Sequence, residues 1–444
     1  MAIHFEIFRT WDIMKSIIEH RRKVMDIFGL YIELWLAITL ISVVGVILLA
    51  LLTLVIWGIF AYKRYPKSTE YKKYAFFIPA RNEGNVIRET IASIRAMDYP
   101  QDKITIFILA NNCSETDQTA NIARELGEEV FELKDKKVNN VGMVLERFFE
   151  FIKQKYGSYS AFDGYVRLDA DNLVHKDYLS RMNDAFCVNP TVITAYRANQ
   201  NFNDGIRASL TCMLVTQCMI AFRMFSGWGA SPIITGPGIL IGASVVEKMG
   251  GWHCKSISED CELSALLCKL KIRVHFCYDA IFYDEQANKM KIVFRQRLRW
   301  TKGTNQVFFK YWFTMIARVF SNMWKTAIFL VIGLVPMGLI SVLFTLGFGI
   351  FGVVSAILTQ SADPVLIWLI ITAALNLIPG WFMGIVTFIV ERKRIKLPWY
   401  KKVLYVLFNP LGYMMHTVAD FCRCFIRVKW KPVPHGQIKN QTTT

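Results

Sequence analysis

Two aspartates separated by one residue follow a short apolar segment in the first half of the chain. Asp169 and Asp171 come directly after residues 165–168, a pattern typical of a β-strand that ends in a turn. Carboxylates at this spacing can face one cation, and such oxygen ligands suit Mg²⁺ or Mn²⁺. The same residues could instead form a turn that only caps the strand. The sequence therefore offers a candidate metal site, with a structural turn as the alternative.

A second acidic group, Ser258-Glu259-Asp260, precedes an apolar run at residues 261–267. Polar residues before such a run are typical of a helix N-terminus, where they satisfy open backbone N–H groups. The alternative is catalytic, because a carboxylate at the mouth of a pocket could take the proton from a hydroxyl group. The residues by themselves leave capping and general-base catalysis equally open.

A third group combines basic and aromatic side chains in a long stretch of helical pattern. Gln296, Arg299 and Trp300 lie within residues 296–300, which read Gln-Arg-Leu-Arg-Trp. An arginine offers a bidentate fork for a diphosphate, and an indole offers a flat apolar face for a sugar ring. A basic amphipathic helix at a bilayer surface would explain the positive charges as well. It would not explain Gln296 beside Arg299 and Trp300.

The surrounding sequence predicts the elements that must hold these side chains. Strands are predicted at residues 74–79, 104–110 and 165–168, and helices at residues 86–94 and 119–126. Strands that alternate with helices predict βαβ units and a parallel sheet. Ligands of such sheets bind at the carboxyl ends of the strands. The polar residues that follow the first two strands, at 80–83 and 111–114, are therefore expected at the same edge of the sheet as Asp169.

The composition of the chain points to a protein that is partly in a membrane. Hydrophobic residues make up 53% of the 444 residues and charged residues only 20%, whereas an ordinary soluble domain has about 25% charged residues. This composition excludes an intrinsically disordered chain and argues against a wholly soluble one. The apolar residues are clustered at residues 29–62, 326–358 and 365–390, with a mixed block at 403–426.

The basic residues beside these blocks predict the topology. Lys and Arg follow the first block, precede the second and follow the third, whereas residues 359–364 contain neither. The positive-inside rule then predicts a multi-pass protein of the cell membrane with a cytoplasmic central domain. The side of the N-terminus stays open. The predicted domains are an amphipathic segment 1–28, a transmembrane segment 29–62, the cytoplasmic domain 63–325, a transmembrane region 326–428 and a basic/polar tail 429–444.

Two shorter apolar stretches inside the central domain are not predicted to cross the membrane. Residues 210–225 are interpreted as an interfacial helix, and residues 233–246 as a loop and strand before Ser258. The net charge of +17 is concentrated beside the apolar blocks. Anionic membrane lipids are therefore the expected partner of these charges, and nucleic acid is not.

Taken in order, the motifs resemble those of the membrane-embedded family 2 glycosyltransferases that make cellulose, hyaluronan, chitin and poly-N-acetylglucosamine. The resemblance covers about residues 74–305, with apolar blocks on both sides as in that family. It rests on four segments in the family's order, each weak alone: residues 79–83 (Pro-Ala-Arg-Asn-Glu), 169–171 (Asp-Ala-Asp), 258–260 (Ser-Glu-Asp) and 296–300 (Gln-Arg-Leu-Arg-Trp).

The resemblance implies an α/β GT-A (Rossmann-like) cytoplasmic domain with flanking transmembrane and interfacial α-helices. It implies a processive inverting enzyme that polymerises a UDP-linked sugar into a β-linked polysaccharide and moves the growing chain across the membrane. The implied donor-nucleotide residues are Ala80, Arg81, Glu83, Asn111, Asn112 and Asp169, and Asp171 with Asp169 would hold Mg²⁺ or Mn²⁺. Asp260, with Glu259 beside it, would be catalytic, and Gln296, Arg299 and Trp300 would hold the donor diphosphate and the growing chain.

Two departures from the family pattern bear on the donor. The family has an aspartate after the second strand, where this chain has Asn111 and Asn112, and residues 139–143 lack the lysine of a later motif. These departures weaken the prediction of a uridine nucleotide more than that of a transferase. The first alternative function is a non-processive transferase that adds one sugar to a lipid. The second is a non-enzymatic transporter or scaffold, which predicts ionisable residues inside the apolar spans; the central spans contain almost none.

Overall fold

The computed structural model describes residues 52–426 continuously, together with positions 16, 20, 35, 38, 39, 42, 43 and 45–50. The chain divides into two compact units, Met1–Ile56 and Trp57–Thr444. The predicted central domain, residues 63–325, lies in the second unit. Apart from positions 16 and 20, the predicted amphipathic segment 1–28 lies outside the described residues, and so does the predicted tail 429–444. The described end of the predicted segment 29–62 belongs to an apolar helix, Gly45–Ala61.

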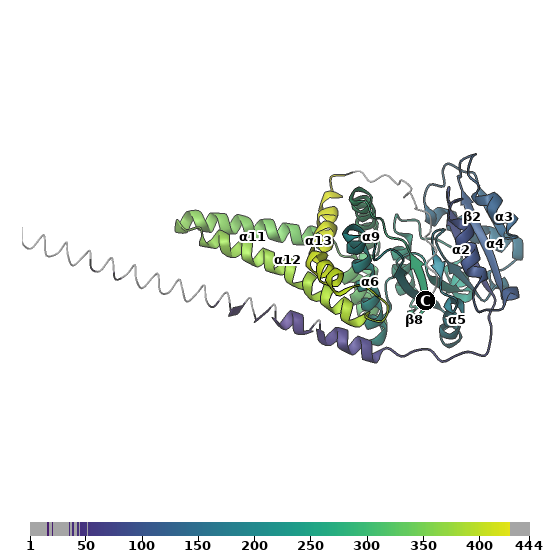
Figure 1. The fold of residues 1–444 in the computed structure, drawn as a ribbon, viewed down its shortest axis with the longest axis horizontal. Coiled ribbons are helices and arrows are strands. Elements are labelled where there is room, and N and C mark those ends of the chain that lie inside the picture. Colours follow the sequence, from purple (N-terminus) through teal and green to yellow (C-terminus); the bar gives the residue numbers. More distant parts are fainter. Residues whose placement is uncertain are drawn as a thin grey trace, which may run out of the picture. The chain divides into compact units, whose positions relative to one another are not determined.

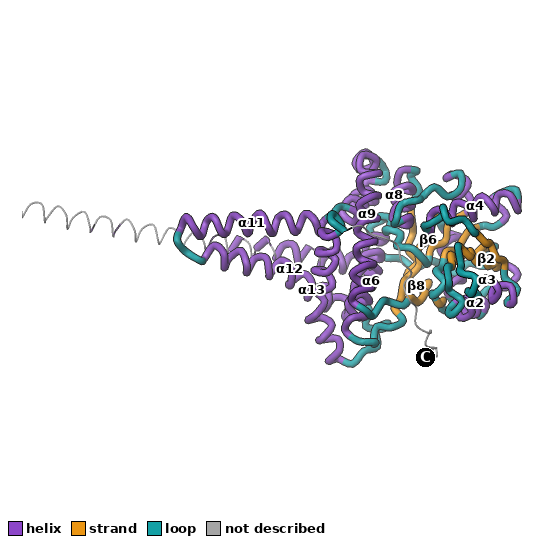
Figure 2. Tube along the Cα trace, turned by 90° about the horizontal axis from the view of Figure 1, so that it is seen from above, coloured by secondary structure: helices purple, strands orange, loops and turns teal. Residues whose placement is uncertain are grey.

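The described strands form one mixed sheet (Figures 1 and 2). They are β1 (Tyr74–Ala80), β2 (Ile104–Asn111), β3 (Glu129–Leu133), β4 (Gly164–Arg167), β5 (Leu173–Val174), β6 (Val192–Asn199), β7 (Ile239–Gly242) and β8 (Val274–Asp284), in the order β3-β2-β1-β4-β7-β6-β8-β5. β1 runs parallel to β2 and β4, and β2 runs parallel to β3. The three strands predicted from the sequence, β1, β2 and β4, are thus confirmed.

The predicted parallel sheet is confirmed for β1–β4 and is wrong for the second half of the sheet. β7 runs antiparallel to both of its neighbours, β4 and β6, and β5 runs antiparallel to β8. The chain enters β7 through residues 236–238 (Gly-Pro-Gly), where both glycines have positive φ (100° and 77°). β7 lies between β4 and β6, so the sheet joins a parallel half to a mixed half.

Helices cover both faces of the sheet, which explains why the central strands are apolar throughout. Successive residues of β1 point to opposite faces, so that Phe76 packs in one core and Phe77 in the other. The first core includes side chains of α2 (Ile87–Arg95) and α5 (Tyr178–Val188). The second includes side chains of α4 (Val141–Tyr156), α7 (Ala243–Met249) and α8 (Glu259–Lys269). With α3 (Thr119–Glu125) between β2 and β3, the predicted helices are confirmed.

A group of long helices adjoins the sheet domain. It consists of α6 (Ile206–Gly227), α9 (Met290–Val319), α10 (Trp324–Leu334), α11 (Met337–Thr359), α12 (Asp363–Val390) and α13 (Trp399–Cys422). α6 packs on β6 and β8 and also on α12 and α13, while α9 packs on α8, α10 and α13 (Figure 1). The predicted apolar block 326–358 is therefore two helices, because Pro336 lacks the N–H that would continue α10 into α11.

Among the described residues, three helices are long and apolar enough to cross a membrane: α6, Gly338–Leu358 within α11, and α12. α11 and α12 lie side by side and leave most of their surface exposed in the protein (Figure 2). α6 differs, because 67% of its apolar window is buried inside the protein. The segment interpreted as a 16-residue interfacial helix is thus part of a 22-residue helix that packs between the sheet and the other helices.

Gly303 is the point at which α9 lies closest to the start of α8. A Cβ added at this position would lie 2.0 Å from Ser258 Oγ and 2.8 Å from the Ser258 backbone nitrogen. We expect Gly303→Ala to force the helices apart and to lower the free energy of unfolding by about 1–3 kcal/mol, the usual range for overpacking. The measurement is the thermal unfolding midpoint in detergent. Gly347→Ala is the matched control, because a Cβ there meets no atom within 4 Å; equal midpoints for the two variants would contradict this packing.

Candidate active site

The loops that follow β1 and β2 are joined by hydrogen bonds. Asn82 has a left-handed backbone (φ 61°), and its Oδ1 accepts a hydrogen bond of 2.8 Å from the Ser114 N–H. The Glu83 N–H donates to Thr119 Oγ1 at 2.9 Å. The two polar segments that the sequence placed at one edge of the sheet are therefore neighbours, as expected for parallel strands with adjacent carboxyl ends.

The residues predicted to bind the nucleotide differ in their burial and in the contacts that their side chains already make. Ala80 is buried at the end of β1, opposite Ala110, so its contribution is limited to the backbone. Asn112 uses its amide nitrogen to hold the next loop, donating to the carbonyl oxygens of Asp135 (2.9 Å) and Val138 (3.0 Å). Arg81 and Glu83 are half-buried in the loop after β1, and Asn111 is buried.

The aspartates after β4 form a tight turn closed by Asn172. The Asp169 N–H donates to Asn172 Oδ1 (3.0 Å), and the Asn172 N–H donates back to the Asp169 carbonyl oxygen (3.1 Å). The turn expected as the structural alternative is thus present. It leaves both carboxylates half-buried at the edge of the sheet. Burial raises the pKa of Asp169, opposed by the charge of Arg167 and supported by that of Asp171.

The donor set of this turn fits a hard divalent cation. Asp169 and Asp171 supply only carboxylate oxygens, and Mg²⁺ and Mn²⁺ accept one or two such ligands together with water and substrate phosphates. Within the described part of the chain, there is no cluster of three or more His, Cys, Asp and Glu side chains that could hold a metal by itself. Any cation at this turn would therefore complete its coordination with oxygens from outside the protein.

Arg167 connects the turn to the second acidic group. This arginine is the last residue of β4 and is only 4% exposed. Its Nη2 donates to Glu259 Oε1 at 2.9 Å and lies 3.7 Å from Asp169 Oδ1. Sequence reasoning missed Arg167, although a charged residue inside an apolar strand, two residues before Asp169, was a visible signal. The ion pair places Asp169 and Glu259, 90 positions apart in the chain, on either side of one guanidinium group.

Asp260 follows Glu259 at the start of α8, with one carboxylate oxygen near the loop at Gly236. Its Oδ1 accepts a hydrogen bond from the Cys261 N–H (2.8 Å), while Oδ2 lies 3.6 Å from where a Cβ on Gly236 would be. Burial and the charge of Glu259 raise the pKa of Asp260 to about 6, and the charges of Arg167 and Arg299 oppose the rise. Ser258 occupies the N-cap position of α8 without a side-chain cap hydrogen bond. The predicted capping alternative, in which Ser258 or Asp260 satisfies open backbone N–H groups, is therefore wrong for Ser258 and confirmed for Asp260.

α9 brings the third group to the same place. Gln296, Arg299 and Trp300 are half-buried in the first part of this helix, and Arg299 is close enough to Asp260 to lower its pKa. The Trp300 ring lies 5.2 Å from the guanidinium carbon of Arg297. The helix is held on α8 by Glu262, whose carboxylate accepts hydrogen bonds from the Ser256 N–H (2.7 Å) and from the Lys310 ammonium. Burial alone would raise the pKa of Glu262, but these two donors outweigh it and lower the pKa.

The mixed Rossmann-like sheet, with acidic side chains at the ends of its strands, is the architecture of a GT-A glycosyltransferase. A comparison with protein-family models gives the family. The model described as "Glycosyltransferase like family 2" matches residues 72–303, more than half of the chain, and the chain belongs to that family.

Curated relatives agree with this membership. A probable glycosyltransferase of Bacillus subtilis, YdaM, is 28% identical over 262 residues (54% of this chain, 57% of that protein). A beta-monoglucosyldiacylglycerol synthase of Synechocystis is 25% identical (54% and 50%). A poly-beta-1,6-N-acetyl-D-glucosamine synthase of Staphylococcus epidermidis is 24% identical (54% and 57%). The chain thus spans about half the length of the curated relatives it matches.

Similarity to a solved structure extends over most of the chain. A mannosyltransferase from Pyrobaculum calidifontis, in complex with GDP-Man and Mn²⁺, aligns over 82% of this chain and 90% of that chain, with 14% identity and a TM-score of 0.47.

The Arg167–Glu259 ion pair should be strongly coupled energetically. Arg167→Met leaves Glu259 buried without its partner, which typically costs about 3–5 kcal/mol. Glu259→Gln should cost less, because the amide oxygen can still accept a hydrogen bond. The double variant should be more stable than the sum of the single changes by about 0.5–3 kcal/mol.

Denaturant unfolding of the four proteins measures this cycle. Arg88→Met is the control, because the Arg88–Glu125 pair is exposed on both sides and such pairs contribute about 0–1 kcal/mol. If the losses in the free energy of unfolding of the two single variants add up to the loss of the double variant, the predicted coupling between Arg167 and Glu259 is contradicted.

Proposed function

We propose that this protein is a membrane-bound, inverting and processive glycosyltransferase that polymerises a nucleotide-linked sugar into a β-linked polysaccharide. One observation carries the proposal: Arg167 connects the Asp169 turn to Glu259 beside Asp260, and the charge of Arg299 on α9 lowers the pKa of Asp260. Displacement at a sugar carbon needs this combination, since the leaving diphosphate and the accepting hydroxyl must be held in line with a base beside the hydroxyl.

Asp260 is the proposed general base. Its Oδ2 faces the loop at Gly236 and is therefore available on the side away from α8. A raised pKa of about 6 matches a base that works near neutral pH. Glu259 is buried and ion-paired with Arg167, so its role is to hold Arg167 in place and to raise the proton affinity of Asp260.

Asp169 and Asp171 are the proposed holders of Mg²⁺ or Mn²⁺. When bound there, the cation stabilises the negative charge that develops on the leaving nucleotide diphosphate. Asp169 and the loops after β1 and β2 would bind the nucleotide, with Arg81, Glu83, Asn111 and the backbone at Ala80 nearest to it. A UDP-linked donor follows from the resemblance to the polysaccharide synthases, and Asn111 in place of their aspartate is the reason to test other nucleotides.

Gln296, Arg299 and Trp300 are the proposed contacts of the donor diphosphate and the terminal sugar. The guanidinium group of Arg299 would pair with phosphate oxygens, and the Trp300 ring would stack on a sugar face. Stacking has little directional demand, so a growing chain can shift along the ring after each addition. This property supports repeated transfer rather than a single one.

The arrangement of the helices supports synthesis at a membrane. α9 runs from the candidate site to α10 and α13, and α13 packs with the apolar α11 and α12. We place residues 63–325 on the cytoplasmic side, residues 29–62 and 326–428 in the membrane region, and the basic flanks on anionic lipids. The polymer would leave through the membrane beside these helices.

Transfer of one sugar to a lipid is the second candidate function. Its support is that a beta-monoglucosyldiacylglycerol synthase is as similar to this chain as the polysaccharide synthase is (25% and 24% identity). The two functions differ in product length. Membranes that contain the protein, supplied with one radiolabelled UDP-sugar at a time and Mg²⁺ or Mn²⁺, should yield a polymer that linkage-specific glycosidases digest. A labelled product of lipid size from every donor would instead establish the lipid transferase.

The general-base role predicts a defined pH dependence. Since Asp260 must be ionised to accept the proton, turnover should fall about tenfold per pH unit below the pKa of about 6 and level off above it. Asp260→Asn should remove transfer at every pH while UDP binding persists. Glu259→Gln removes the neighbouring negative charge, so it should move the acidic limb of the pH profile to lower pH. Retained synthesis by Asp260→Asn would refute the assignment.

Trp300 should affect the growing chain more than the donor. We expect Trp300→Ala to lower the rate of polymer elongation by about two- to tenfold, because a stacking contact with an aromatic ring is worth about 0.5–1.5 kcal/mol and is lost at each addition. Hydrolysis of the UDP-sugar by water should change much less. Gel separation of the polymer and release of UDP are measured in the same reaction. Phe313→Ala is the control, since Phe313 lies on the exposed side of the same helix (85% exposed).

A further inference from the structure

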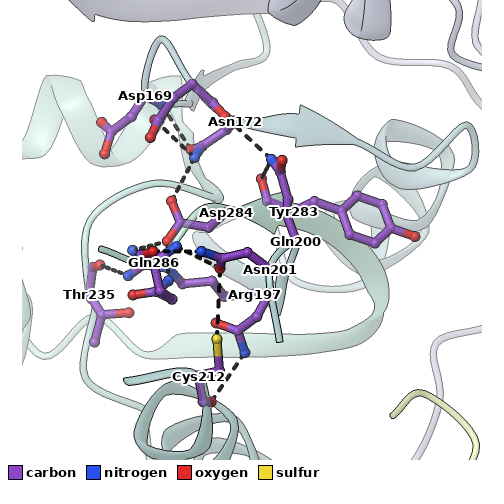
Figure 3. A network of polar contacts seen from close by, with 12 residues as sticks. Asp169, Asn172, Arg197, Gln200, Asn201, Cys212, Thr235, Tyr283, Asp284 and Gln286 are labelled. Carbon is purple, nitrogen blue, oxygen red and sulfur yellow. Dashed lines mark hydrogen bonds and ion pairs between the residues drawn. The ribbon is translucent and has the colours of Figure 1, made fainter. Parts of the chain in front are cut away.

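The turn that carries Asp169 and Asp171 rests on a buried network that sequence reasoning did not identify. Its centre is Asp284, the last residue of β8, which is 4% exposed. Figure 3 shows Asn172 between the Asp169 turn and Asp284, with Arg197 and Gln286 on the far side of the Asp284 carboxylate. Asn172 and Asp284 lie 112 positions apart in the chain.

Asn172 uses every polar group of its side chain to hold the turn. Its Oδ1 accepts from the Asp169 N–H (3.0 Å), and its Nδ2 donates to Asp284 Oδ1 (2.9 Å) and to Asp171 Oδ1 (3.4 Å). The residue is fully buried. A side chain with this many partners has one orientation, so the separation of Asp169 and Asp171 depends on where Asp284 holds Asn172.

Asp284 is itself held from the opposite side. Its Oδ2 accepts hydrogen bonds from Arg197 Nε (3.0 Å), Arg197 Nη2 and Gln286 Nε2. Both carboxylate oxygens are therefore occupied by protein donors, and the charge is balanced by Arg197. This occupation argues against Asp284 as a third metal ligand and in favour of a supporting role.

The same network reaches the loop that faces the proposed base. Arg197 Nη1 donates to the Thr235 carbonyl oxygen (3.3 Å), one residue before Gly236, whose position faces Asp260 Oδ2. On the other side, Gln200 Nε2 donates to the backbone carbonyl oxygens of Tyr283 (3.3 Å) and Asp171 (3.5 Å) (Figure 3). The strand ends of β6 and β8 thus support the aspartate turn through both side-chain and backbone contacts.

We propose that Asn172 and Asp284 are positioning residues that fix the Asp169 and Asp171 carboxylates in the arrangement that receives the divalent cation and the nucleotide diphosphate. This inference rests on the proposed function, because it assigns the cation to Asp169 and Asp171. Residues that orient metal ligands commonly change metal affinity or activity by about 10–100-fold when they are replaced.

The test measures Mn²⁺ binding directly. Free Mn²⁺ is followed by electron paramagnetic resonance during titration of the full-length protein in detergent, with UDP present. Asn172→Ala removes the three side-chain hydrogen bonds, and Asp284→Asn presents an amide nitrogen to groups that are all donors. Each variant should weaken Mn²⁺ binding by about tenfold or more. High Mn²⁺ should restore sugar transfer by Asn172→Ala, which a purely structural role would not produce.

Asn183→Ala is the matched control. Asn183 is equally buried (2% exposed) and accepts a hydrogen bond from the Tyr74 hydroxyl at the start of β1, the opposite end of the strands from the aspartate turn. This control should lower the thermal unfolding midpoint and leave Mn²⁺ binding unchanged. If Asp284→Asn does not fold, Asn172→Ala decides the question.

The outcomes distinguish a failure of the positioning role from a failure of the proposed function. If the wild type binds Mn²⁺ and folded Asn172→Ala binds it with an affinity within about twofold of the wild type, the positioning role is overturned and the proposed function remains intact. Absence of Mn²⁺ binding to the wild type with UDP overturns the metal assignment and the positioning role together. Equal weakening in Asn183→Ala shows a general loss of structure and also overturns the positioning role.

Discussion

The candidate site gathers negative charge at one edge of the sheet, and two arginines, the buried Arg167 and the half-buried Arg197, make that arrangement stable. Asp169 and Glu259 flank Arg167, while Asp284 pairs with Arg197. Buried carboxylates without such partners would lose solvation and repel one another. The arginines come from β4 and β6, the two strands that flank the antiparallel β7. The insertion of β7 therefore sets the spacing of the positive charges on which the acidic groups depend.

α9 joins this charged edge to the apolar helices. Its first part contributes Arg299 beside Asp260, and its later part packs on α8, α10 and α13. Gly303 allows close approach to Ser258, and Lys310 reaches the buried Glu262. One continuous helix therefore connects the candidate site with α10 and α13. Under the proposed function, this helix would couple sugar transfer to movement of the product.

The loop after β2 is one of the two places in which this chain departs from the pattern of the synthases that it resembles. Asn112 stands near the place where those enzymes carry an aspartate, and its amide nitrogen holds the loop at residues 135–138. The side chain thus has a structural role in addition to any contact with a nucleotide. Under the proposed function, these loops would contact the donor nucleotide, so Asn111 and Asn112 are the residues most relevant to donor choice.

The sequence alone determined the strands β1, β2 and β4, the helices between them, the acidic motifs and the apolar blocks, because each depends on neighbouring residues and on hydrophobic period. It also predicted that polar residues after parallel strands would meet, which the loops at Asn82 and Ser114 confirm. Tertiary structure decided the antiparallel β7 and the partners of Arg167 and Asp284. Those partners lie 92 and 112 positions away, at Glu259 and Asn172. Such pairs form only when the strand order brings distant segments together and burial makes each unpaired charge too costly to leave.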